Sequence, residues 1–132
     1  MGQARAARRH NVWRSGDSRL AVRDVLLAER ARVTAQLESL TRDFDRIVEA
    51  SLGVGNDDEH DPEGTTVAFE RAQVASLLSE AQHELRDIDL ALERLRDGTY
   101  GTCAHCEKPI APERLVARPS AAMCIDCASI GW

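Results

Sequence analysis

Four cysteines near the C-terminus constrain this chain more than any other feature of its sequence. They form two C-x2-C pairs with seventeen residues between them, Cys103 with Cys106 and Cys124 with Cys127. The short spacing lets both thiolates of a pair bind one ion, and the long insert can fold back so that four sulfurs surround a tetrahedral zinc. Because such a site has no open coordination position, we expect one structural zinc ion, whose binding helps to fold a small head at residues 98–132.

Two other interpretations of the cysteine region stay open. Each C-x-x-C pair, taken alone, is compatible with a redox dithiol, so a thiol sensor that releases zinc on oxidation is one hypothesis. His105 lies between the first two cysteines. It can replace a ligand, but we favour a solvated position close to the site.

The apolar residues before the head predict an antiparallel two-helix coiled-coil hairpin over residues 17–97, and hence a mostly α fold. Apolar residues recur at heptad spacing in the first half, and steps of four and three alternate in the second half. Gly53, Gly55 and Gly64 interrupt the pattern, which favours a hairpin over a long helix that dimerises in parallel. The predicted seam positions are Leu26, Arg30, Val33, Leu37, Leu40, Phe44, Ile47 and Ser51, then Val67, Arg71, Val74, Leu78, Ala81, Leu85, Ile88, Leu92 and Leu95.

Three further positions carry structural expectations. Arg30 and Arg71 place charges in the seam, and Arg30 is positioned to pair with an acid of the other helix. Asp61-Pro62 is typical of a helix start, with Thr65 and Thr66 as competing caps. Asp97-Gly98 is typical of a helix end, with Gly98 in the left-handed conformation.

Charge is unevenly distributed along the chain. Residues 1–16 contain four arginines and no acid, and we predict a flexible basic arm there that includes Trp13. The hairpin turn, residues 53–66, is acidic, and such a run is by itself typical of a solvated turn. The acids of this predicted tip are Asp57, Asp58, Glu59, Asp61 and Glu63.

Composition excludes several classes of function. The 132 residues contain no long apolar run, so we expect no membrane span, and the N-terminus lacks the apolar stretch of a secretory signal. The net charge of −5 gives no basic field for nucleic acid, so we expect no direct DNA binding. No phosphate loop or nucleophile motif is present, and an enzyme is not expected. We predict a soluble, cytoplasmic monomer.

The finger region carries a resemblance to a known family. G-T-Y-G-T-C-A-H-C at 98–106, with A-R-P at 117–119 ahead of C-I-D-C at 124–127, resembles the DksA/TraR family of four-cysteine zinc-finger transcription regulators. The resemblance implies a partner, RNA polymerase, whose secondary channel the hairpin enters. It also implies that the tip acids point toward the polymerase active site and that the zinc is structural.

The chain departs from the family pattern at two places. The tip motif D-P-x-D-x-A matches at Asp61 and Pro62, but Gly64 replaces the second aspartate and Thr66 the alanine; Glu63 or Asp58 is a candidate substitute. Five residues follow Cys127, so contacts that depend on the long C-terminal helix of the best-known member do not carry over. Two alternative functions therefore remain: a stress-associated scaffold without channel activity, and a weak nucleic-acid binder that uses the basic arm.

Overall fold

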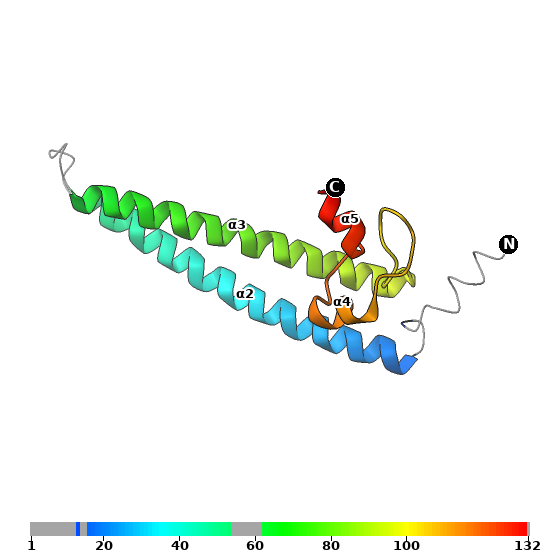
Figure 1. Ribbon diagram of the computed structural model, residues 1–132. Coiled ribbons are helices and arrows are strands. Elements are labelled where there is room, and N and C mark those ends of the chain that lie inside the picture. Colours follow the sequence, from blue (N-terminus) through cyan, green and yellow to red (C-terminus); the bar gives the residue numbers. More distant parts are fainter. Residues whose placement is uncertain (1–12, 14–15, 54–61, 132) are drawn as a thin grey trace. The chain divides into compact units, whose positions relative to one another are not determined.

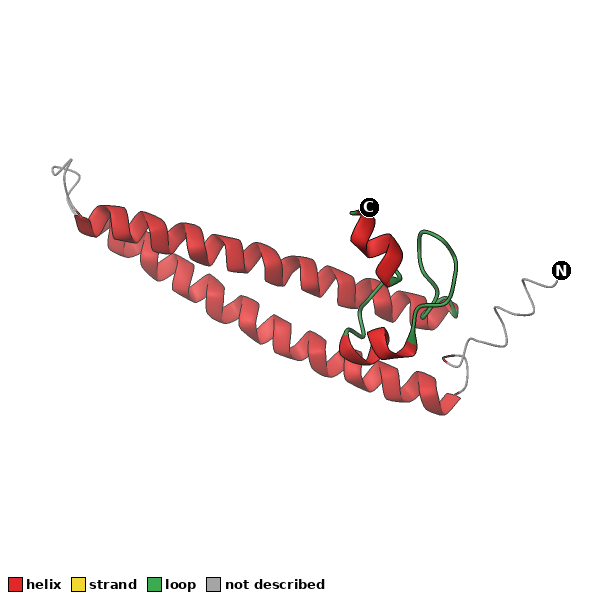
Figure 2. Cartoon of the chain, in the orientation of Figure 1, coloured by secondary structure: helices red, strands yellow, loops and turns green. Residues whose placement is uncertain are grey.

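The protein is mostly helical, as predicted. The computed structural model describes residues 13, 16–53 and 62–131. Two long helices, α2 (Gly16–Gly53) and α3 (Pro62–Asp97), precede two short ones, α4 (Pro112–Ala117) and α5 (Ile125–Ile130) (Figure 1). Over these residues the chain contains helices and loops but no strand (Figure 2). The two long helices pack against each other and the four cysteines gather near the C-terminus, which confirms the predicted fold class.

The chain forms two compact units, each containing part of α2 and part of α3. Of the described residues, one unit holds those up to Ala31 and those from Arg86 onward, and the other holds those between 32 and 85. Within each unit the two helical segments lie side by side and run in opposite directions (Figure 1). The helices pair through seam residues in both units, as the heptad pattern predicts.

Burial follows the predicted seam in each unit. In the first unit Leu26, Ile88 and Leu95 are almost fully buried, at 0%, 1% and 4% exposure. In the second, Val33 and Ala81 are buried at 0% and 2%, and the remaining apolar seam positions are half-buried. The seam is therefore the apolar contact that joins α2 to α3.

Ion pairs connect the two helices beside the seam. In the first unit Arg30 Nε donates to Asp89 Oδ1 at 2.7 Å, so the expected pairing of Arg30 with an acid on the other helix is confirmed. In the second, Arg32 Nη2 donates to Glu84 Oε1 at 2.9 Å. All four side chains are substantially exposed, so each pair contributes about 1 kcal/mol or less and mainly favours one register of the helices.

The helix ends have local causes in the sequence. α2 begins at Gly16, one residue before the predicted hairpin boundary, and Asp17 lies in the first turn, where a negative charge is favourable. α3 begins at Pro62, the favoured first position for proline, rather than after Thr65 or Thr66. It ends before Gly98, which has φ of 80°, and the Thr99 amide donates to the Arg94 carbonyl at 2.9 Å. This is the left-handed helix end that Asp97-Gly98 predicts.

Two predicted segments fall outside the residues that the structure describes. Of the tip acids, Asp57, Asp58, Glu59 and Asp61 lie outside them, and only the backbone of Glu63 is described, in the first turn of α3. The predicted basic arm also lies outside, apart from Trp13 and Gly16. In the described part of the chain, no helix has the length and apolar character needed to cross a membrane.

The seam yields a stability prediction. Ile88→Ala removes a side chain that is 1% exposed, and we expect it to lower the free energy of unfolding by about 2–4 kcal/mol. Guanidinium denaturation of the zinc-loaded protein, followed by far-UV circular dichroism, measures this.

Leu90→Ala is the matched control on the same helix, because Leu90 is 49% exposed. Its cost should stay within about 0.5 kcal/mol, as is usual for surface positions. If both variants lose the same free energy of unfolding, the seam does not bury Ile88 as described.

Candidate metal centre

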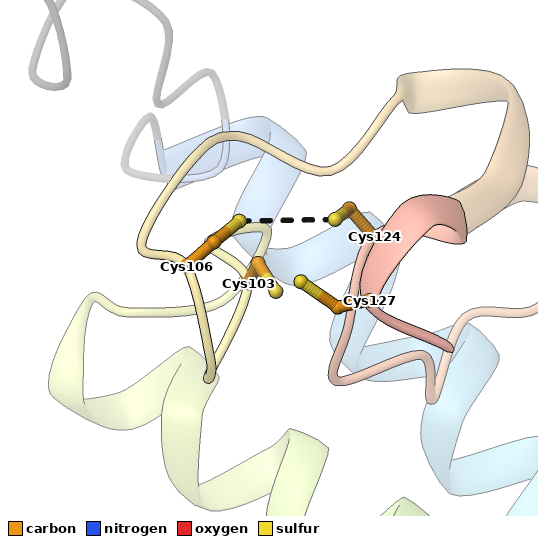
Figure 3. Close-up of side chains that lie close together, drawn as sticks. All are labelled: Cys103, Cys106, Cys124 and Cys127. Carbon is orange, nitrogen blue, oxygen red and sulfur yellow. Dashed lines mark hydrogen bonds between the residues drawn. The ribbon is translucent and has the colours of Figure 1, made fainter. Parts of the chain in front are cut away.

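The four cysteines form one compact cluster of sulfur atoms. Their Sγ atoms all lie within 4.8 Å of one another, and the Cys106 and Cys124 sulfurs are 3.7 Å apart. Figure 3 shows all four side chains pointing toward a common centre, two from the loop after α3 and two from the start of α5. Cys103 and Cys127 are buried at 1% and 7% exposure, whereas the other two are half-buried.

The cluster fits a zinc ion. With Zn–S bonds of about 2.3 Å, tetrahedral geometry places sulfur atoms about 3.8 Å apart, close to the 3.7 Å between Cys106 and Cys124. Four thiolates are also the donor set that zinc prefers in structural sites. The four clustered cysteines can therefore bind one zinc ion. The side chain of His105 is exposed and does not belong to the cluster.

A tight loop brings the first pair together. The Cys103 amide donates to the Lys108 carbonyl at 2.8 Å, and the Glu107 amide donates back to the Cys103 carbonyl at 3.0 Å. Glu107 has φ of 64°, a left-handed conformation that is uncommon outside glycine and that turns the chain sharply after Cys106. The Ile110 amide closes the loop onto the Gly101 carbonyl at 2.7 Å.

Helix α5 positions the second pair. Cys124 is its N-cap residue, and the Ala128 amide donates to the Cys124 carbonyl at 2.9 Å. Residues three apart on a helix lie on the same face. Cys127 therefore presents its sulfur on the same side as Cys124, toward the first pair (Figure 3).

Hydrogen bonds connect the loops that carry the two pairs. The Ala104 amide donates to the Ala122 carbonyl at 2.8 Å, and Tyr100 Oη donates to the Pro119 carbonyl at 2.7 Å. Burial raises the pKa of Tyr100 to about 12, so the phenol stays protonated and keeps this donor at physiological pH. These bonds hold the segment before Cys124 against the loop of the first pair.

Arg114 and a small apolar core support the same segment. Arg114 Nε donates to the Met123 carbonyl at 2.9 Å, immediately before Cys124. Beneath the loops lie four buried apolar side chains, a small number for a head that spans residues 98–132. They are Tyr100, Ile110, Leu115 and Ala121.

The thiols differ in acidity. Burial acts to raise the pKa of Cys103, but hydrogen bonds from backbone amides, first that of Cys106, outweigh it and lower the pKa to about 6. Burial and then contacts with the other sulfurs raise the pKa of Cys127 to about 12. Cys103 therefore loses its proton more readily than Cys127, and a thiolate is the form that binds metal.

Trp13 packs against the head. Its ring meets the ring of Tyr100 edge to face, with centroids 5.4 Å apart and an interplanar angle of 89°. The indole also lies over Gly101, where a Cβ atom would overlap it. Trp13, which the sequence analysis placed in the basic arm, thus contacts the head, and no periodic or motif signal predicted this contact.

Sequence reasoning identified the four clustered cysteines but not their supporting contacts. Arg118 and Pro119 of the A-R-P motif lie in the loop that leads to Cys124, where the Pro119 carbonyl accepts the hydrogen bond from Tyr100. The sequence predicted no role for Tyr100, which belongs to the finger motif, or for Arg114, which lies between the two cysteine pairs. For Tyr100 the available signal was its rarity, since the chain contains one tyrosine and only 4% aromatic residues.

Comparison with known proteins agrees with the finger. Residues 98–130 match the family described as the prokaryotic dksA/traR C4-type zinc finger. The chain is 49% identical over 39 residues to the RNA polymerase-binding transcription factor DksA of Caulobacter vibrioides, covering 30% of this chain and 28% of that protein. It spans less than a third of the length of the first curated relatives that it matches.

Two longer similarities extend beyond the finger. The chain is 31% identical over 91 residues to general stress protein 16O of Bacillus subtilis, which covers 69% of this chain and 52% of that protein. The structure of transcription factor DksA2 from Pseudomonas aeruginosa matches with a TM-score of 0.70 and 27% identity. That match covers 88% of this chain and 84% of the other, so it includes both the long helices and the head.

The cluster predicts a zinc stoichiometry. Purified protein should carry one zinc ion per chain by atomic emission analysis, and Cys127→Ser should lose it, because three thiolates remain. The variant should also melt at lower temperature, since metal binding contributes to folding.

His105→Ala is the control, because its side chain is exposed and outside the cluster. It should keep one zinc ion. Loss of zinc from this variant would indicate a histidine ligand instead.

Gly101 yields a second prediction. Gly101→Ala adds a methyl group where φ is +85° and where the Trp13 indole lies, so it should cost more than the conformational penalty of about 1–2 kcal/mol. Gly131→Ala is the matched control for the backbone penalty alone, because Gly131 has φ of +83° and nothing lies within 4 Å of the added atom.

A double-mutant cycle, measured by denaturant unfolding, separates the penalty of the left-handed backbone from the overlap with the Trp13 indole. In a Trp13→Ala background the cost of Gly101→Ala should fall to that of Gly131→Ala. An unchanged cost would mean that Trp13 does not occupy this position.

Proposed function

Because the chain is a DksA-like member of the DksA/TraR family of C4 zinc-finger proteins, we propose that it binds RNA polymerase and regulates transcription. The observation that carries this proposal is the match to DksA2 over 88% of the chain, which joins the hairpin and the finger in one architecture. Relatives with the matching finger are named RNA polymerase-binding transcription factors. The protein acts by binding, and no catalytic step is proposed.

The hairpin is the part proposed to enter the secondary channel of the polymerase. The resemblance of the sequence to the family motivates this, and two observations support it. The paired helices α2 and α3 flank the acidic turn, and that turn contains five acids and no basic residue other than His60. A negative loop suits a site close to a catalytic magnesium ion and its mobile elements.

The zinc head is proposed to fix the ends of the hairpin. Tyr100 follows α3 directly, and Trp13, just before α2, packs on its ring. With the four cysteines zinc-bound, these contacts hold the start of α2 and the end of α3 against one folded unit. The zinc ion is therefore structural in this proposal.

A second candidate is a stress-associated interaction protein that keeps the fold without channel activity. Gly64, in place of the second tip aspartate, favours it, as does the 31% identity to general stress protein 16O over 69% of the chain. In that case the protein would leave the lifetime of promoter complexes unchanged at saturating concentration.

The test is the affinity of the zinc-loaded protein for core RNA polymerase of its own organism. We expect binding at micromolar concentration or tighter, lost when a known secondary-channel ligand is added. A variant with alanine at all five tip acids should bind but alter promoter-complex lifetime less than the unmodified protein. If its affinity falls as well, the acids contribute to binding.

A matched variant controls for net charge. It replaces five exposed acids of the hairpin helices with alanine, namely Glu38, Asp45, Glu49, Glu70 and Glu80. It should behave like the unmodified protein in both assays. No binding to polymerase at tens of micromolar would reject the proposal and favour the second candidate.

A further inference from the structure

A groove of about 550 Å³ lies where α2 begins and α3 ends. It belongs entirely to the unit that contains the head. Its described lining comes from one face of α2, at residues 16–27, and from the last turns of α3, at residues 92–96. The groove shares no residue with the cysteine cluster or with the acidic turn.

The groove has an apolar floor that is only partly covered. Leu95 is buried at 4% exposure, and Leu92 beside it is half-buried. Leu20 and Leu27, seven residues apart on the same face of α2, are 56% and 42% exposed. Four leucines therefore line one depression, and two of them keep much of their apolar surface in water.

Three arginines surround this floor. Arg19 and Arg23 lie one turn apart on α2, and Arg96 lies on the last turn of α3. All three are exposed, and none forms an ion pair within the described part of the chain. In contrast, the arginines beside the seam, Arg30 and Arg32, each meet a carboxylate of the other helix.

No acid lines the groove among the residues that the structure describes. Three guanidinium groups around one depression repel one another, and each presents a planar set of donors suited to carboxylates. The groove is therefore complementary to a ligand that combines apolar side chains with negative charge. A nucleic-acid backbone supplies the charge but no apolar side chains for the leucines.

We propose that this groove binds an acidic amphipathic helix of a protein partner. Two packed helices leave a groove along their side that accepts a third helix. Apolar residues of the partner at i, i+3, i+4 and i+7 would cover the leucines, and its flanking Asp or Glu would pair with Arg19, Arg23 and Arg96. This proposal does not rest on polymerase binding through the acidic turn.

Two synthetic peptides provide the probe. Each is roughly 18 residues, five turns of helix, with leucines on one face; one has glutamate at the flanking positions and the other has lysine. Fluorescence anisotropy with the full zinc-loaded chain should show the glutamate peptide binding about tenfold more tightly or better, and this advantage should shrink as salt increases.

Two pairs of substitutions locate the site. Arg19→Gln with Arg23→Gln should weaken binding of the glutamate peptide about fivefold, as expected for two lost exposed ion pairs. Leu20→Gln with Leu27→Gln should weaken it about tenfold. The control is Arg42→Gln with Arg71→Gln, which removes the same charge from exposed positions in the other unit and should change the affinity less than twofold.

Circular dichroism and zinc content establish that each variant is folded. Amide chemical shifts should change at residues 16–27 and 92–96 when the glutamate peptide is added. The proposal is overturned if the two peptides bind equally, if the control variant loses as much affinity as the groove variants, or if the shifts change elsewhere.

Discussion

Four sulfur atoms within 4.8 Å of one another are stable as thiolates only when a cation offsets their charge. The loops around them contain little regular structure, and the apolar core beneath is small, so the head has few other sources of folding free energy. The bonds from Tyr100 to Pro119 and from Ala104 to Ala122 join the two cysteine pairs. They persist only while both pairs stay in place.

Contacts outside the cysteine cluster also depend on the loops that carry the two cysteine pairs. Trp13 rests on Tyr100, whose ring is buried because the loops on either side of it are held in place. Helix α3 runs into the same loop through Gly98. The start of α2 and the end of α3 therefore meet a surface formed by the loops that carry the four cysteines.

The features that the sequence predicted are periodic or local. Heptad spacing specified which faces of α2 and α3 become buried, because a helix repeats its orientation every two turns. The helix end at Gly98 needs only one left-handed residue. The cysteine pairs could be read as one cluster because two short spacings already limit where each sulfur lies.

Other contacts could not be read from the sequence because they join distant residues without a repeating pattern. Trp13 lies near Tyr100 only once α2 has been placed beside the head. Arg114 donates to the Met123 carbonyl, a backbone group whose position depends on a loop conformation. Two of the groove leucines, Leu20 and Leu27, also gave no signal, since both fall outside the seam and resemble ordinary surface positions.

The uneven burial of the seam has a dynamic consequence. Among the described residues of the unit 32–85, the buried apolar side chains are Val33 and Ala81, whereas the unit that contains the head buries ten. Opening a segment costs less free energy when it exposes less apolar surface. The helical turns nearest the acidic loop should therefore unwind and reform many times while the head stays folded, which lets that end of the hairpin adjust its conformation against a partner without loss of the metal centre.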